Sequence, residues 1–278
     1  MRTAAQVGKL VERWRAAGMR IGLVPTMGAL HRGHLSLVSI ALKEADRVIV
    51  SIFVNPSQFG RGEDLSSYPS DFDEDLKKLE ETGAHCVFFP SVDEIYPEGF
   101  STSIHVSGLT DTLCGRYRPG HFDGVATVCT ILLRIARPDI AVFGRKDAQQ
   151  LAVIRRMADD LRLGVEIHAG EIVREPDGLA MSSRNSYLNP EERKQAPVIY
   201  SGLSRAAELV LDGERNAERI YSAVREVIDE APLAALQYLE LVDPFTMKPL
   251  LKLTTPALLA VAVYFGRTRL IDNLILKP

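Results

Sequence analysis

Two histidines in the segment VPTMGALHRGH, residues 24–34, are the residues best placed to do chemistry. His31 and His34 are three residues apart, after a short apolar run and before a helix-like one. At the start of a helix, free backbone N–H groups and the positive end of the helix dipole attract anions. Gly28 and Gly33 leave room for a phosphate to approach, and the ring N–H groups of the two histidines can converge on it. This turn therefore predicts a phosphate site.

The spacing excludes two common phosphate-binding motifs and matches a third. The chain has no GxxxxGK[ST], and no GxGxxG follows this strand, so the turn is neither a P-loop nor a dinucleotide fingerprint. The HxGH spacing is similar to the signature of the nucleotidyl-transferring superfamily that includes class I aminoacyl-tRNA synthetases, which act on the α-phosphate of ATP. A turn with one exposed and one helix-capping histidine stays an alternative. A zinc site is disfavoured, because no third ligand lies at a suitable local distance.

Two further segments carry groups that suit a polyphosphate. Lys146 lies in FGRKD, directly after the apolar run DIAV, so it is expected at the same sheet edge as the histidines. There it can neutralise the charge of a leaving pyrophosphate. MSSRN, residues 181–185, offers two hydroxyls and a guanidinium for a lid over a triphosphate. The alternatives are a solvated lysine at a helix start and a serine-rich linker.

Neutral amides follow the second and fourth strand-like runs. Asn55 and Gln58 lie in FVNPSQFG, and Gln149 and Gln150 lie in KDAQQL. Amides donate and accept hydrogen bonds without a net charge, so they suit a small substrate with hydroxyl and carboxylate groups. Turn chemistry around Asn55-Pro56 explains the first pair about equally well.

The order of the elements predicts an α/β fold, a Rossmann-like doubly wound parallel sheet. Strand-like runs occupy residues 21–24, 46–55, 84–90, 139–144 and 164–175. Helix-like runs occupy residues 34–45, 70–83, 123–138 and 147–163. The continuously apolar runs are typical of strands covered on both faces by helices. In such sheets, ligands bind beyond the carboxyl ends of the strands.

A change of composition after residue 176 predicts a second domain. The stretch 176–195 is polar and turn-rich, and two amphipathic helical segments follow it. Three strand candidates come last, at residues 236–243, 257–266 and 270–278, with a turn at residues 266–268 between the last two. We therefore expect residues 1–176 to form the sheet domain and residues 177–278 a smaller α+β lid domain.

Composition narrows the functional class. The 278 residues are 46% hydrophobic and carry a formal net charge of -3, which argues against general binding to nucleic acid or to a membrane surface. Residues 1–20 read as a surface helix without the apolar centre of a signal peptide, so a cytoplasmic location is expected. Cys86, Cys114 and Cys129 form no CxxC pair and are expected to be buried free thiols.

Six segments together resemble the pantothenate synthetases, which join pantoate and β-alanine with ATP. They are PTMGALHRGHLSL, IFVNPSQFG, EDLSSYP, RPGHFDGVATV, FGRKDAQQL and VREPDGLAMSSRN, in this order along the first domain and the linker. The last ninety or so residues resemble the family only in their length and general composition, and they contain no matching motif.

The resemblance implies a role for each matching residue. His34, His31 and Lys146 would be catalytic. The ATP site would comprise Met27, Gly28, Ala29, Leu30, His31, Arg32, Gly33, His34, Gly144, Arg145, Lys146, Asp147, Val173, Met181, Ser182, Ser183 and Arg184. Gln58 would bind pantoate and β-alanine, and Gln150 and Asn55 would bind pantoate.

The resemblance also implies magnesium and a homodimer, but it identifies no metal ligand. Asp75 is a candidate contact, although a solvated acidic helix face is the favoured interpretation of the segment that begins near Asp71. Three departures from the family pattern stand out: Arg32, Arg145 and Ser70. The two arginines add positive charge near the expected polyphosphate, which would tighten ATP or slow pyrophosphate release.

The implied reaction has two steps, formation of pantoyl adenylate with release of pyrophosphate, then attack by the amine of β-alanine. The alternatives are an HxGH nucleotidyltransferase that leaves the nucleotide on another small acid or phosphate, and a catalytically idle ATP-binding regulator. A tRNA synthetase is disfavoured, because the acidic chain has no evident RNA-binding extension.

Overall fold

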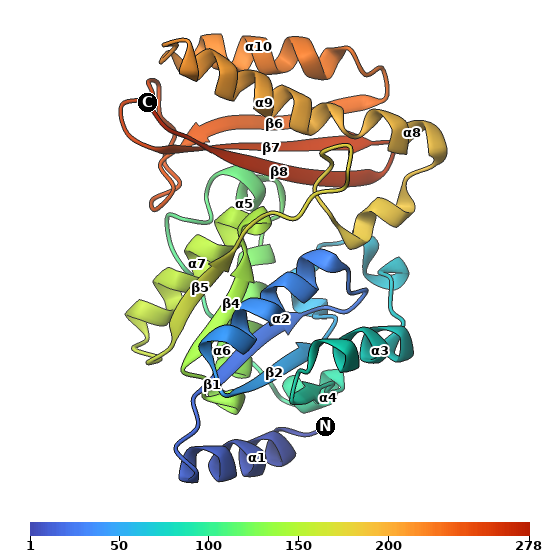
Figure 1. The fold of residues 1–278 in the computed structure, drawn as a ribbon, viewed down its shortest axis with the longest axis vertical. Helices are drawn as coiled ribbons and strands as arrows, with labels where there is room; N and C mark the ends of the chain where they lie inside the picture. The colour runs from blue at the N-terminus through green and yellow to red at the C-terminus, as the bar shows by residue number, and fades with distance from the viewer.

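The computed structural model describes all residues from 1 to 278. It contains two sheets with their helices, and the second sheet lies across one end of the first sheet and its helices (Figure 1). The first sheet is parallel, with strand order β3-β2-β1-β4-β5. Its strands are β1 (Ile21–Thr26), β2 (Arg47–Ile52), β3 (Cys86–Phe88), β4 (Ile140–Gly144) and β5 (Glu166–Gly170). The predicted doubly wound parallel sheet is confirmed, with each strand inside or close to its expected run.

Helices cover both faces of this sheet, and alternate strand residues supply the two cores. On one face, α2 (Arg32–Glu44) and α3 (Phe72–Thr82) pack on Val24, Val50 and Val142. On the other face, α1 (Ala4–Ala16), α6 (His121–Ala136) and α7 (Ala148–Asp160) pack on Leu23 and Ile49 among others. Burial on both faces explains why the strands are apolar throughout. The short helices are α4 (Val92–Ile95) and α5 (Leu113–Tyr117).

The second sheet is antiparallel and contains β6 (Ala234–Val242), β7 (Ala257–Phe265) and β8 (Thr268–Leu276). The turn between β7 and β8 is at the predicted place, and β8 begins two residues earlier than expected. α9 (Val198–Leu211) and α10 (Ala217–Asp229) cover the outer face, and α8 (Pro190–Gln195) precedes them. The inner face, including Ala260 and Ala262, packs into the core of the first sheet domain. The antiparallel sheet is thus held between its own helices and the parallel domain.

The strand order fixes where a ligand site can form. β1 pairs with β2 on one side and with β4 on the other, through Gly22 with Ile140 and Leu23 with Ala141. The order of the strands reverses between β1 and β4, which is the usual ligand position in an open α/β sheet. The segments that follow β1 and β4 therefore lie side by side, below the antiparallel sheet (Figure 1).

The three cysteines are free and buried, as expected. None of the helices combines the length and the apolar composition that a membrane crossing requires.

Candidate functional site

The two histidines of the HxGH turn form a reciprocal cap at the start of α2. His31 Nδ1 accepts a hydrogen bond from the Gly33 N–H at 3.1 Å, and His34 Nδ1 accepts one from the His31 N–H at 3.3 Å. The ring centroids are 4.1 Å apart. Because both Nδ1 atoms are acceptors, each neutral ring carries its proton on Nε2. Nε2–H is then the donor that each ring has left for a ligand.

Both imidazoles are neutral at physiological pH. Burial, reinforced by the charge of Lys146, lowers the pKa of His31 to about 4. Burial, with His31 and Lys146 nearby, lowers the pKa of His34 to about 3. Positive charge for an anion must therefore come from Lys146 and the arginines, while the histidines act as neutral donors.

Asp75 holds the turn from the opposite side. Its carboxylate accepts the N–H groups of Ala29 at 2.8 Å and Leu30 at 2.7 Å, and the residue is only 2% exposed. The favoured interpretation of a solvated acidic face is therefore wrong for Asp75, because α3 packs it beneath the turn. The N–H groups of Ala29 and Leu30 are not free for a phosphate, contrary to the argument from the sequence.

Two glycines are required by this geometry. Gly28 has a φ of +84°, which L side chains rarely adopt. At Gly33, an added Cβ would lie 2.8 Å from His31 Cε1, so the ring of His31 rests directly against the glycine. Only a residue without a side chain leaves this histidine in place.

Lys146 lies in the 3-10 turn η3 (Arg145–Asp147), directly after β4. Its side chain is 21% exposed, and the closest carboxylate oxygen, Asp147 Oδ2, is 3.8 Å from Nζ. The ammonium group is thus mostly enclosed and only weakly paired, which leaves it available to an anionic ligand.

The MSSRN segment folds over the HxGH turn instead of forming a free loop. Ser183 lies in the 3-10 helix η4 (Ser183–Tyr187), and its Oγ donates to the Ala29 carbonyl at 3.0 Å. Ser182 Oγ accepts the Arg184 N–H, and the Val173 carbonyl accepts the N–H of Met181. Backbone and side chains together fix this segment at the open side of the histidines.

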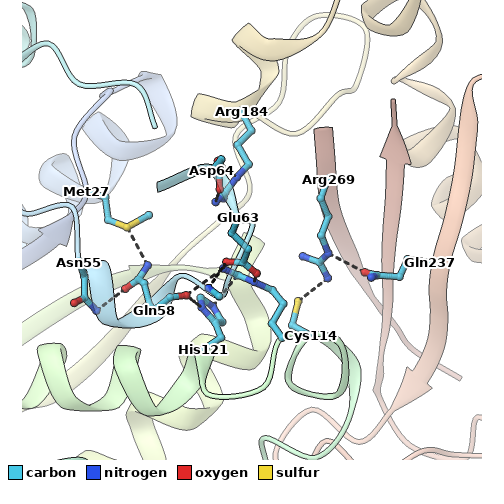
Figure 2. Close-up of polar contacts among 12 residues, drawn as sticks. Met27, Asn55, Gln58, Glu63, Asp64, Cys114, His121, Arg184, Gln237 and Arg269 are labelled. Atoms are coloured by element: carbon cyan, nitrogen blue, oxygen red, sulfur yellow. Dashed lines mark hydrogen bonds and ion pairs between the residues drawn. The ribbon is translucent and has the colours of Figure 1, made fainter. Parts of the chain in front are cut away.

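The amides have different surroundings, which separates their possible roles, and Figure 2 shows those of Asn55 and Gln58. Gln58 donates through Nε2 to Met27 Sδ at 2.9 Å and accepts through Oε1 from Asn55 Nδ2 at 3.0 Å. Asn55 is 1% exposed, and its amide also contacts the Gly124 carbonyl and the Tyr96 hydroxyl. Asn55 therefore orients Gln58 and has little left for a ligand.

Of the two neighbouring glutamines, Gln150 has an amide that is wholly free, and Gln149 has only its amide oxygen free. Gln149 is buried and donates through Nε2 to the carbonyls of Leu109 and Thr112. Gln150 lines the cavity, and its amide makes no hydrogen bond to the protein. Gln149 also lines the larger part of the cleft, and its Oε1 accepts no hydrogen bond, so this amide offers a free acceptor but no free donor.

An arginine and a histidine that the sequence analysis did not single out lie beside Gln58. His121 Nδ1 is 2.8 Å from the Gln58 carbonyl oxygen, and Arg118 Nη2 donates to the same oxygen at 3.3 Å. Arg118 also pairs with Glu63 at 2.6 Å. Burial and the Arg118 charge lower the pKa of His121 to about 4, so its ring is neutral. In the sequence, these two residues could have been found from their position in the turn before an apolar helix.

The groups line two adjoining parts of one interdomain cleft, with volumes of about 210 and 700 Å³. His31, His34, Met27, Gln58 and Val173 line the smaller part. The shared boundary consists of Arg118, His121, Lys146, Asp147, Gln150, Ser182 and Arg184. A multiply charged anion and a small polar acid fit side by side in such a cleft.

Several residues expected in the ATP site do not line the cleft: Gly28, Ala29, Leu30, Arg32 and Arg145. Arg32 is exposed and lies 3.7 Å from Glu175, and Arg145 Nε is 2.9 Å from Glu171. The charge of both unusual arginines is therefore offset by a carboxylate. No group of three or more His, Cys, Asp or Glu side chains is arranged to hold a metal ion.

Comparison with known proteins gives one consistent result. A family model described as pantoate-beta-alanine ligase matches residues 1–275. The chain is 54% identical over 271 residues to the pantothenate synthetase of Thermoanaerobacter sp. (strain X514), covering 98% of this chain and 96% of the relative. It is likewise 54% identical over 268 residues to that of Carboxydothermus hydrogenoformans, covering 96% and 95%.

Solved structures agree with the sequences. The crystal structure of pantothenate synthetase from Thermus thermophilus superposes with a TM-score of 0.96 at 45% identity, covering 100% of this chain and 99% of the other. The pantoate-beta-alanine ligase from Francisella tularensis, complexed with beta-gamma ATP and beta-alanine, superposes with a TM-score of 0.83 at 34% identity, covering 99% and 96%.

Proposed function

The chain belongs to the pantoate-β-alanine ligase family and catalyses ATP-dependent ligation of these two substrates, and we propose that the interdomain cleft is where the reaction takes place. The observation that carries this assignment is the shared cavity. It brings His31, His34 and Lys146 together with the amides of Gln58 and Gln150. Donors and a cation for a polyphosphate thus adjoin neutral amides for a small hydroxy acid.

In the first step, a carboxylate oxygen of pantoate attacks the α-phosphorus of ATP. A new O–P bond forms, the bond to the β-phosphate bridging oxygen breaks, and pyrophosphate leaves. The Nε2–H groups of His31 and His34 and the ammonium of Lys146 stabilise the charge that develops on the phosphates. Each such contact is worth about 3 kcal/mol in the transition state. No protein nucleophile is needed, and positioning supplies most of the rest.

In the second step, the amine of β-alanine attacks the acyl carbon of pantoyl adenylate, and AMP leaves as the amide forms. Gln58 and Gln150 hold the pantoyl group, with Gln58 also at the entry of β-alanine. The adenylate is a water-labile mixed anhydride. The segment from Met181 to Arg184, which covers the histidines, keeps water from it.

Magnesium is expected to accompany ATP, and the residues present fit it. Mg²⁺ keeps several waters and is typically held by substrate phosphates plus one or two carboxylates, which agrees with the absence of an all-protein metal cluster. Asp147 lines both parts of the cleft and its side chain is 47% exposed, so it is the carboxylate that we assign to the metal. When bound, the metal neutralises phosphate charge.

One assay tests the assignment. ATP with pantoate alone should release pyrophosphate, and later addition of β-alanine should release free AMP and the amide. A product that retains the nucleotide would instead identify a nucleotidyltransferase. We expect His34→Ala and Lys146→Ala each to slow pyrophosphate release about a hundredfold while leaving the fold intact. Near-normal turnover in either variant would remove that residue from the site.

Three further properties of the chain are proposals. We assign residues 1–176 and 177–278 to two domains, because the first sheet ends at Gly170 and the polar stretch follows. A cytoplasmic location accords with ATP use and with three free thiols. We also propose that the chain forms a homodimer, because the family resemblance implies one. Sedimentation equilibrium of the purified chain would test this proposal.

A further inference from the structure

The last strand of the antiparallel sheet contacts the turn that carries Lys146. Asn273 of β8 is 6% exposed, and its Nδ2 donates to the carbonyls of Arg145 at 3.0 Å and Lys146 at 2.9 Å. Both amide hydrogens are therefore used on consecutive carbonyls of η3. A 3-10 turn of three residues has few backbone bonds of its own, so these two side-chain bonds fix much of its position.

The preceding residue of the same strand, Asp272, binds a segment on the other side of the nucleotide site. Asp272 is 3% exposed, and its carboxylate forms a bidentate pair with Arg174, with Oδ1 to Nη2 at 3.0 Å and Oδ2 to Nη1 at 2.5 Å. Arg174 Nη1 also donates to the Gly178 carbonyl, and its backbone forms a bridge with Ala180. Asp272 thus holds the segment that leads from Val173 to Ser182.

Asp272 and Asn273 are linked to each other as well. Asp272 Oδ1 accepts the backbone N–H of Asn273 at 2.7 Å. Successive residues of a strand point to opposite sides, so the two side chains reach different segments of the first domain. A buried charge and a buried amide are costly unless they are fully paired, and here both are paired with residues that surround the cleft.

We propose that Asn273 is a positioning residue for ATP: it fixes the turn of η3 and thereby the placement of Lys146, while Asp272 fixes the opposite wall through Arg174. This inference rests on the proposed function of Lys146. The second domain thus contributes directly to the geometry of the nucleotide site, although neither residue needs to touch the reacting atoms. A displacement of about 1 Å in such a group costs up to roughly a hundredfold in rate.

Asn273→Asp is the most direct test, because it keeps the shape of the side chain and removes both donors. We expect pyrophosphate release to slow at least about tenfold and the KM for ATP to rise, with the KM for pantoate within about twofold of the parent. Asn273→Ser keeps one hydroxyl donor, so its rate of pyrophosphate release and its KM for ATP should lie between those of the parent and of Asn273→Asp. Should Asn273→Asp not fold, Asn273→Ser decides the question by the same measurements.

Two controls separate positioning from general destabilisation. Asn216→Asp, at the N-cap of α10 on the outer side of the second domain, should leave both KM values unchanged. In the double variant Lys146→Ala with Asn273→Asp, the loss of rate should be smaller than the product of the two single losses, because Asn273 acts on the turn that carries Lys146. Losses that multiply, or a parent-like rate in Asn273→Asp, would overturn the inference.

Calorimetric titration with a nonhydrolysable ATP analogue keeps the two proposals distinguishable. If the parent forms no pyrophosphate, the proposed function fails. In that case, weaker analogue binding by Asn273→Asp than by Asn216→Asp would still support the positioning of the nucleotide site, and equal binding would refute it.

Discussion

Arg184 and Asp64 form a bidentate ion pair across the mouth of the cleft, with Nε to Oδ2 at 2.8 Å and Nη2 to Oδ1 at 2.9 Å (Figure 2). The guanidinium hydrogen bonds and charge lower the pKa of Asp64, although burial opposes the shift. The pair joins the segment after Ser183 to the short 3-10 helix at residues 64–67. The sequence analysis assigns Arg184 to ATP. Its guanidinium can bind a phosphate only if it also keeps, or gives up, its hydrogen bonds to the Asp64 carboxylate.

We predict that Asp64→Asn lowers the KM for ATP by a few-fold, because the triphosphate no longer competes with a carboxylate for Arg184. The measurement is pyrophosphate release at saturating pantoate over a range of ATP concentrations. Asp160→Asn, which removes the partner of the more exposed Arg156 at the far end of α7, serves as the matched control and should not change this KM. A higher KM in Asp64→Asn would mean that the carboxylate orients the guanidinium for ATP.

Gly33→Ala is predicted to impair ATP use without unfolding the chain. The new methyl group would meet the ring of His31 at 2.8 Å, and the ring must turn away to relieve the contact. We expect a rate loss of about tenfold or more in pyrophosphate release, since one oriented donor is lost. Gly8→Ala in α1, where nothing lies within 4 Å, is the control and should leave the rate unchanged. A parent-like rate for Gly33→Ala would show that the orientation of the His31 ring does not matter for pyrophosphate release.

Gln58→Ala is predicted to affect pantoate more than ATP. The side chain is held by Asn55 and lines the smaller part of the cleft, so truncation removes a fixed amide from the acid side of the site. Loss of a hydrogen bond to a charged group costs about 1.5 to 3 kcal/mol, so the KM for pantoate should rise about tenfold or more. Gln6→Ala in α1 is the control. A defect confined to the KM for ATP would contradict the placement.

The three partly buried histidines of the site predict that the chain loses stability in mild acid. The pKa values of His31 and His121 are lowered to about 4 and that of His34 to about 3, from 6.5 in the unfolded chain. Between these values the unfolded state binds more protons, so the free energy of unfolding falls as the pH drops from 6.5 towards 4. Each histidine contributes at most about 1.4 kcal/mol per pH unit before solvent screening.

Urea unfolding at several pH values in this window measures the slope. His34→Gln should flatten it by removing one of the three titrating groups. Asn216→Ala, which removes the N-cap of α10 and no titrating group, should leave the slope unchanged. An equal effect of both substitutions would show that burial of His34 does not control the acid sensitivity.

The parallel sheet was predictable because its signals are local. Apolar runs such as VIVSIFV reflect burial on both faces, and the helical periodicity of residues 34–45 reflects packing on one face. The placement of His31, His34 and Lys146 in one cavity also followed, since the carboxyl ends of neighbouring parallel strands share an edge. By contrast, the favoured interpretation of Asp75 as part of a solvated acidic face was wrong, and the turn chemistry offered as an alternative for Asn55 is present in the hydrogen bond from the Ser57 N–H to Asn55 Oδ1. Only their tertiary partners show that both side chains are buried and hydrogen-bonded to distant parts of the chain.

What the sequence alone determined is the order of the elements, the HxGH turn and the family, because periodicity and motif spacing are written in neighbouring residues. What only the tertiary structure decided is which groups stay free for a ligand. Hydrogen bonds across long stretches of chain, such as those of Asp75 with Leu30 and of Asn273 with Lys146, consume some polar groups and position others. Such pairings depend on how separate elements pack, and no local pattern encodes them.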